Sequence, residues 1–349
     1  MMKKIISSGM KFLRLSYLWV TRILFAPNHF KVCFFKKIAL NIFGGYTADQ
    51  YVLYDFKNNS KKDYLSEFDW YKSRYINYAF NKMVDNKIVC SEVLKHYVKI
   101  PKIFIARYKG NFIYYDENVK TFEDIISLLK REKSLFVKPI DAGKGKGVHR
   151  FKFEDTQIYI DKTPYSEEKF TAFLKSTGDW LITELIVQHP FLDQIYDQTT
   201  NTMRIITMKD IKTSDFKVFF AVQRIGTYET IPVDNGSRGG LVSKIDLETG
   251  ELGTAKSLHS LQEHTVHPDS KNPIKGIKIP NWEEIKTQVI TLAKNFPFMN
   301  LIAWDILLID DGICIIEANT SSGVNIIQLW GGQKNDELGD FYRYYKIIK

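Results

Sequence analysis

Apolar residues recur at helical spacing in the first part of this 349-residue chain and at strand spacing in the second. Residues 1–75 are predicted to be mainly helical, and a further helical pattern ends at Pro101. A short strand is expected at 103–106. A helix is expected over 121–131, because Thr121 is a candidate N-cap with acidic residues after it.

From residue 135 onward, short apolar runs are separated by Gly, Asp and Asn, which is typical of strands joined by turns. One helix, about 281–295, interrupts the runs, and a hairpin follows around the three-residue turn Asp310-Asp311-Gly312. The predicted strands are 135–139, 148–153, 180–183, 202–208, 217–225, 240–246, 301–309 and 313–319. These elements predict a mixed α+β protein with largely antiparallel sheets.

Length and composition narrow the class of protein. A chain that is 44% hydrophobic at this length can bury a real core and is expected to form two or three domains. Its three cysteines, Cys33, Cys90 and Cys314, lie far apart, so neither a disulfide framework nor a paired-Cys zinc site is expected. A cytoplasmic location follows.

The net charge of +9 is concentrated near the N-terminus, where eight Lys and Arg residues precede the first acidic residue, Asp49. These cations interrupt the apolar residues too often for a transmembrane helix or a secretory signal. The pattern of residues 1–45 instead predicts either a helix at an anionic membrane surface, on the inner face of the plasma membrane, or a basic helix packed on the protein itself. Nucleic acid is not an expected partner, because no zinc-finger or aromatic RNA-binding motif accompanies the charge.

Candidate chemistry is strongest in the hairpin 302–319. A three-residue loop would place Asp305 opposite Glu317 on one face, where two like charges are destabilising unless something neutralises them. Asn319, two residues beyond Glu317, adds a neutral oxygen to that face. These hard oxygen donors predict a Mg²⁺ site rather than a zinc site. The alternative, a solvated polar face, conflicts with the apolar neighbours.

A glycine-rich loop is expected within residues 135–151. Glycines there let backbone N–H groups approach a phosphate, but the Walker spacing is missing and a strand follows, so this is not a P-loop. Lys138 lies in the apolar strand before the loop, where a lysine needs an anionic partner or a route to solvent. The glycines are Gly143, Gly145 and Gly147, and they alternate with Lys144 and Lys146.

Several short motifs together resemble the ATP-grasp superfamily. They are DNK at 85–87, VKP at 137–139, the glycine loop, ITELI at 182–186, NTMRIIT at 201–207 and the Asp…Glu-x-Asn hairpin. Longer runs at 188–207, 233–252 and 279–297 resemble the sugar-transfer-associated ATP-grasp proteins of bacterial surface-polysaccharide clusters, over about residues 80–330. The resemblance implies two α+β subdomains that clamp ATP, preceded by a mainly helical region.

The expected domain division follows from this resemblance. It comprises a basic helical region at 1–75, a substrate-side subdomain at 76–134, a glycine-loop ATP lid at 135–190 and a C-terminal core with the metal site at 191–349.

The resemblance also implies roles for individual residues. Lys87 and Lys138 would bind the ATP phosphates beneath a lid of Gly143, Gly145 and Gly147, and Glu184, Leu185 and Ile186 would hold the adenine. The acid that commonly binds the ribose hydroxyls in this superfamily is not evident at its expected position, and Asp193 is the candidate substitute. Arg204, with Lys138, would stabilise charge on the transferred phosphoryl group, and Asp305, Glu317 and Asn319 would hold Mg²⁺.

The segment 224–240 is a candidate substrate loop, for an acidic sugar or an amino acid, or else a polar hairpin. Its candidate contacts are Arg224, Asp234, Asn235 and Arg238. His267 is expected to stabilise a turn rather than to serve the site.

The expected function is an ATP-dependent carboxylate–amine ligase that forms an amide through an acyl phosphate. Its substrates would be a small-molecule or lipid-linked sugar carboxylate, such as a uronic acid, and an amino acid. Two alternatives remain: a ligase acting on free amino acids or a peptide tail, and a nucleotide-binding membrane scaffold without turnover.

Overall fold

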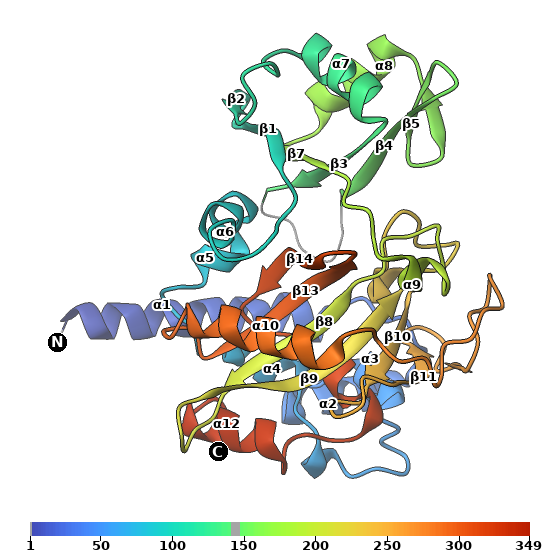
Figure 1. Ribbon diagram of the computed structural model, residues 1–349. Coiled ribbons are helices and arrows are strands. Elements are labelled where there is room, and N and C mark those ends of the chain that lie inside the picture. The colour runs from blue at the N-terminus through green and yellow to red at the C-terminus, as the bar shows by residue number, and fades with distance from the viewer. Residues whose placement is uncertain (1, 141–146) are drawn as a thin grey trace.

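In a computed structural model, which describes residues 2–140 and 147–349, the chain folds into two lobes, each built on a seven-stranded antiparallel sheet (Figure 1). The smaller lobe stands above the larger one and is joined to it by two linkers (Figure 1). The prediction of an α+β protein with largely antiparallel sheets is confirmed.

The smaller lobe has the strand order β2-β1-β7-β3-β4-β5-β6. Its strands are β1 (Ile103–Tyr108), β2 (Asn111–Tyr114), β3 (Ser134–Pro139), β4 (His149–Glu154), β5 (Gln157–Ile160), β6 (Thr163–Tyr165) and β7 (Trp180–Glu184). Helices α7 (Phe122–Glu132) and α8 (Glu167–Ser176) pack on the sheet around Phe151, Phe170 and Trp180. Helix α7 begins as predicted, because the Thr121 hydroxyl accepts a hydrogen bond from the Asp124 amide at 3.1 Å.

The expected boundary at residue 134 falls inside this lobe. Strand β1 pairs with β7, and β7 pairs with β3, so residues on both sides of the boundary share one sheet. Sequence periodicity cannot reveal this, because it does not say which strands pair. The division into 76–134 and 135–190 therefore does not describe separate structural units.

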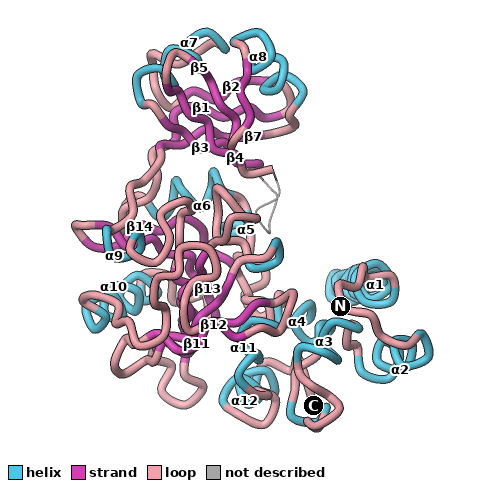
Figure 2. The backbone as a smooth tube through the Cα atoms, turned by 90° about the vertical axis from the view of Figure 1, so that its right-hand side faces the viewer, coloured by secondary structure: helices cyan, strands magenta, loops and turns pink. Residues whose placement is uncertain are grey.

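The larger lobe has the strand order β12-β11-β10-β9-β8-β13-β14. Its strands are β8 (Met203–Lys209), β9 (Phe216–Ile225), β10 (Leu241–Ile245), β11 (Leu252–Ser257), β12 (Glu263–His264), β13 (Leu301–Ile309) and β14 (Gly312–Asn319). Helix α10 (Trp282–Lys294) covers one face, and the N-terminal helices lie on the other side of the sheet (Figure 2). The shorter elements are α9 (Pro190–Asp193), η3 (Gly236–Arg238), α11 (Val324–Ile327), η4 (Gln328–Trp330) and α12 (Glu337–Tyr344).

The N-terminal region is mainly helical, as predicted. It contains α1 (Met2–Trp19), the π-helical turn η1 (Val20–Leu24), α2 (Phe34–Gly44), α3 (Ala48–Leu53), η2 (Lys61–Asp63) and α4 (Glu67–Ser73). The helical pattern before Pro101 divides into α5 (Lys82–Asp85) and α6 (Lys87–Leu94), because Asn86 lies outside helical geometry and caps α6. None of the helices that the structure describes combines the length and apolar character required to span a lipid bilayer.

Strand alternation in the larger sheet determines which side chains lie near the N-terminal helices. Ile206, Phe220 and Ala303 pack in the core shared with η1, α4 and α12. Side chains two residues apart on a strand share a face, so Arg204, Arg224 and Asp305 are expected on that same face. The N-terminal helical region therefore borders the polar end of the sheet.

Candidate active site

The hairpin of β13 and β14 places Asp305 opposite Glu317, as predicted, but by a different register. Ile309 pairs with Gly312, so the turn is one residue tighter than expected. A bulge at Ile316 restores the pairing, because Ile306 pairs with Ile315 whereas Asp305 pairs with Glu317. Without the extra residue, Asp305 would face Ile316 and the Glu317 side chain would point to the other face.

Asp305 belongs to a chain of alternating charges at the end of the sheet. Arg204 donates two hydrogen bonds to its carboxylate, each 2.7 Å long, and Arg224 donates a third at 3.0 Å. Arg224 also donates to Asp234 at 2.6 Å, and the backbone and hydroxyl of Thr202 donate to that carboxylate at 2.6 Å. Two arginines therefore neutralise Asp305 in this structure, and the metal site at Asp305, Glu317 and Asn319 stays a prediction.

The chain of charges and the burial of its members shift their pKa values in opposite directions. Burial on its own raises the pKa of Asp305, but the charges and hydrogen bonds of Arg204 and Arg224 outweigh burial and hold that pKa below its ordinary value. Burial likewise opposes the charge on Arg204, yet the attraction of Asp305 raises the pKa of Arg204. Burial raises the pKa of Asp234, and the nearby Arg224 opposes the change.

Two lysines converge on Glu317 from different elements. Lys87 is the first residue of α6, and its Nζ lies 3.5 Å from Glu317 Oε1. Lys138 lies in β3 of the smaller lobe, where burial lowers its pKa to about 8 although Glu317 acts in the opposite direction. A lysine whose charge is disfavoured in this way gains from an added anion beside it.

These groups line a cavity of about 100 Å³ between the lobes. It gathers most of the predicted set: Lys87, Lys138, Glu184, Ile186, Arg224, Asp234, Asn235, Asp305 and Glu317. Thr200, Thr202 and Phe136 also line it and were not predicted. Thr202 could have been found from the NTMRIIT run, because it stands two residues before Arg204 on the same strand edge.

Other predicted residues lie outside this cavity. Arg204 binds Asp305 but does not line the cavity, and Leu185 does not line it either. Arg238 is exposed and lies in η3. Asp193 is also exposed and accepts a hydrogen bond from Gln188 at 2.6 Å. Gly147 has a φ of +71°, and an added Cβ would lie 2.9 Å from Pro139 Cγ, so a side chain is disfavoured there. Gly143 and Gly145 lie outside the described residues.

His267 is a structural residue, as expected. It is buried, and its ring stacks on Tyr196 with centroids 4.4 Å apart. Its Nδ1 accepts hydrogen bonds from the amides of Asp269 and Ser270, and its Nε2 lies 2.8 Å from the Gly226 carbonyl oxygen.

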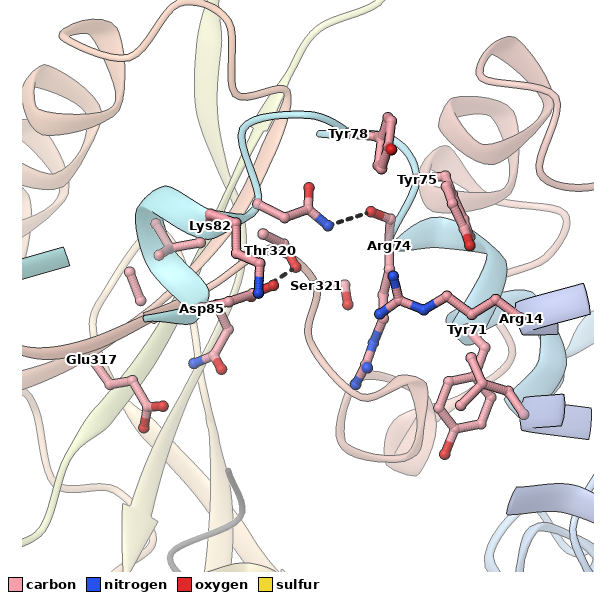
Figure 3. Close-up of a pocket in the computed structure, with 15 residues that line it drawn as sticks. Arg14, Tyr71, Arg74, Tyr75, Tyr78, Lys82, Asp85, Glu317, Thr320 and Ser321 are labelled. Atoms are coloured by element: carbon pink, nitrogen blue, oxygen red, sulfur yellow. Dashed lines mark hydrogen bonds between the residues drawn. The ribbon is translucent and has the colours of Figure 1, made fainter. Parts of the chain in front are cut away.

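A second, larger cavity of about 430 Å³ adjoins the first on the side of the N-terminal helices (Figure 3). Glu317 lines both cavities, and Asn319 lines only the second. Arg14 and Arg74 also line it. No sequence pattern indicated this cavity, because its walls come from segments about 60 and 240 residues apart along the chain.

The donor chemistry at Glu317 fits a hard divalent cation. No group of three His, Cys, Asp or Glu side chains suited to a metal occurs within residues 2–140 and 147–349, so an amide oxygen must complete any such set. Glu317 and Asn319 stand two residues apart on β14 and both line the second cavity. Asp305 uses three of its roughly four acceptor positions on arginines. The residues present therefore fit Mg²⁺, with Asp305 contributing its remaining position.

Two lobes with a lysine-lined cavity between them, a carboxylate hairpin and a glycine-containing turn define an ATP-grasp protein. The family described as sugar-transfer associated ATP-grasp matches residues 67–336, and the chain belongs to this family. No curated protein matches the chain significantly.

Solved structures of ATP-grasp ligases are also similar to this chain. A D-alanine-D-alanine ligase from Helicobacter pylori is 14% identical, with a TM-score of 0.41, over 75% of this chain and 61% of that one. The ATP-grasp ligase PsnB complexed with minimal precursor is 14% identical, with a TM-score of 0.37, over 71% of this chain. The match covers 55% of the PsnB chain, so this chain spans about half of its length.

Replacing Arg224 tests the chain of buried charges. The substitution Arg224→Gln should lower the free energy of unfolding by about 3–5 kcal/mol, because it removes a charge shared by two buried carboxylates. Urea denaturation measures the change. The matched control Arg238→Gln removes an exposed arginine nearby and should cost less than about 0.5 kcal/mol. Equal losses in both variants would contradict the account.

Proposed function

We propose that this protein is an ATP-dependent carboxylate–amine ligase that forms an amide through an acyl phosphate. The proposed substrates are a sugar carboxylate, such as a uronic acid, and an amino acid, in the biosynthesis of a cell-surface polysaccharide. One observation carries this proposal: Lys87, Lys138 and Glu317 converge in the interlobe cavity of a chain that belongs to a sugar-transfer associated ATP-grasp family.

In the proposed reaction, the protein binds and orients the substrates and neutralises the charge of the phosphates, and no enzyme nucleophile is required. Lys87 and Lys138 bind the phosphates of ATP, and an added phosphate restores the charge that burial disfavours on Lys138. Bound Mg²⁺, held by Glu317, Asn319 and Asp305, would supply Lewis-acid charge at the phosphate oxygens. The lobes exclude water while the carboxylate oxygen takes the γ-phosphoryl group and until the amine attacks the acyl carbon.

The other residues are assigned from their positions. Glu184 and Ile186 line the cavity where β7 ends, which supports a contact with the adenine. Arg204 binds Asp305 and does not line the interlobe cavity, so we assign it to positioning that carboxylate rather than to a contact with phosphate. Arg224, Asp234 and Asn235 line the cavity and remain candidates for substrate contact, whereas Arg238 does not.

The alternatives differ in substrate or in turnover. A ligase for free amino acids or a peptide tail would use the same cavity between the lobes. A nucleotide-binding scaffold would not require a retained set of Lys138, Asp305, Glu317 and Asn319 around one pair of cavities. The ligase is therefore the better account.

Turnover tests the ligase. Wild type should release ADP and phosphate from Mg-ATP only with both co-substrates, in a panel that pairs uronic acids with amino acids. Glu317→Gln should lower the rate at least about 100-fold, since even residues that act through a metal ligand cost about 10- to 100-fold. The control Glu248→Gln changes an exposed turn residue and should retain full activity. Nucleotide binding without turnover on any pair would favour the scaffold.

We further propose that α1 and α2 lie on an anionic membrane surface, from the cytoplasmic side. Met10, Leu13 and Tyr17 form a stripe at helical spacing on α1 and are 62%, 68% and 66% exposed. Phe34, Phe35 and Phe43 of α2 are exposed as well. Lysines accompany both helices, which supports binding to anionic lipid.

Vesicle sedimentation tests the membrane surface. Leu13→Ser with Tyr17→Ser should abolish pelleting with vesicles of phosphatidylglycerol and phosphatidylcholine, because both apolar contacts are lost. Tyr114→Ser removes an exposed aromatic residue from the other lobe and should pellet like wild type. Equal pelleting of wild type with purely phosphatidylcholine vesicles would contradict the role of charge.

A further inference from the structure

The second cavity shares Glu317 with the interlobe cavity. Its walls come from α1, from α4, α5 and the segment that joins them, and from the end of β14 and the residues after it. The volume of about 430 Å³ is in the range of small-molecule sites. Because Glu317 borders both cavities, a molecule in the second one lies next to the proposed phosphoryl-transfer site.

Two arginines meet at the far end of this cavity. Arg74 is half-buried, and its guanidinium stacks 4.6 Å from the ring centroid of Trp70 and 5.3 Å from that of Tyr71. In the part of the chain that the structure describes, no carboxylate forms an ion pair with Arg74 or with Arg14. Figure 3 shows both guanidinium groups pointing into the cavity, with Glu317 on its other side.

The two arginines oppose one another electrostatically. Burial lowers the pKa of Arg74, and the charge of Arg14 acts in the same direction, whereas Tyr71, Asp85 and Glu67 act against this shift. A pair of like charges with unused N–H donors is relieved by an anion that binds both. Each guanidinium carries five donors in a planar fork, so together they suit an anion with several oxygens and more than one charge. A phosphate ester meets that description better than a single carboxylate.

The walls of this cavity suit a sugar ring. Tyr71, Tyr75 and Tyr78 provide aromatic faces on the side of the arginines. Between the arginines and Glu317, Thr320 and Ser321 provide hydroxyl groups, and Lys82 and Asp85 provide one charge of each sign (Figure 3). Such a wall can contact the C–H faces of a ring and hydrogen bond with its hydroxyls. The cavity thus has an anion-binding end with aromatic walls, a polar middle and a reactive end at Glu317.

We propose that this cavity binds a glycosyl phosphate, with the phosphate held by Arg14 and Arg74 and the reacting group of the sugar directed to Glu317. This assignment rests on the proposed ligase and specifies the class of its sugar substrate. Arg14 lies outside the matched residues 67–336, so helix α1 adds a contact that the family match does not include.

A binding experiment with a defined probe tests the assignment. The full-length protein, saturated with Mg-ADP so that phosphate cannot enter the interlobe cavity, is titrated with glucose 1-phosphate by calorimetry, with glucose and glucuronic acid as comparison ligands. Wild type should bind glucose 1-phosphate more tightly than either. Arg14→Gln should weaken binding by about tenfold to hundredfold, because a hydrogen-bonded charge is lost.

Arg22→Gln is the matched control. Arg22 is an exposed arginine on the adjoining turn η1 and does not line the cavity, so its loss should leave the affinity unchanged. Arg74→Gln provides a second test, with ADP affinity and circular dichroism confirming that the variant folds. Absence of glucose 1-phosphate binding to wild type, or equal binding by Arg14→Gln and Arg22→Gln, would overturn the assignment.

Two further outcomes separate this proposal from neighbouring ones. If Arg14→Gln weakens binding to phosphatidylglycerol vesicles more than Arg22→Gln does and leaves glucose 1-phosphate affinity intact, the arginines serve the lipid surface and the assignment falls. Arginine-dependent glucose 1-phosphate binding in a protein that never turns over ATP would support the cavity and reject the ligase. Turnover of ATP that does not depend on Arg14 would support the ligase and reject the assignment of this cavity.

Discussion

Asp305 is a buried carboxylate held by two arginines that reach it from neighbouring strands, and the polar end of the larger sheet depends on this interaction. Arg204 and Arg224 come from β8 and β9, and Asp305 comes from β13. Removing Asp305 leaves Arg204 buried without a carboxylate partner, and removing Arg224 leaves Asp234 without its arginine, which costs far more than the pair contributes. The requirement for mutual neutralisation therefore fixes the alignment of three strands and the position of the carboxylate hairpin.

The hairpin in turn connects the two lobes. The Ile315 amide donates to the Lys99 carbonyl at 2.9 Å, and the His189 amide donates to the Leu308 carbonyl at 2.8 Å. Lys99 and His189 lie on the two linkers between the lobes, so both linkers are attached to β13 and β14. A movement of the smaller lobe would change the distance between Lys138 and Glu317 and leave the hairpin in place. Such an arrangement suits a site that must admit substrates and then exclude water.

Local patterns predicted much of this structure because they depend on nearby residues. Alternating apolar runs located the strands that carry the site, and Thr121 marked the start of α7. The pairing of Asp305 with Glu317 was also predicted, although a tighter turn and a bulge together produce it. Lys138 stood out because a lysine within an apolar strand needs a partner.

Long-range arrangements were beyond the sequence. Periodicity does not tell which strands pair, so the unity of the smaller lobe across residue 134 was missed. Nor does it show that Arg224 neutralises Asp305, or that Arg14 and Arg74 meet in one cavity. Each of these contacts joins segments far apart in the chain, where only tertiary packing decides the neighbours.

The central claim is that a carboxylate is phosphorylated between Lys138 and Glu317, and an isotope-transfer measurement tests it most directly. Uronic acids and amino acids labelled with ¹⁸O in the carboxyl group would be incubated with the protein, Mg-ATP and hydroxylamine as the acceptor amine. The account predicts a hydroxamate and phosphate that carries one ¹⁸O atom from the carboxylate. Release of phosphate without ¹⁸O, from any carboxylate that supports turnover, would contradict it.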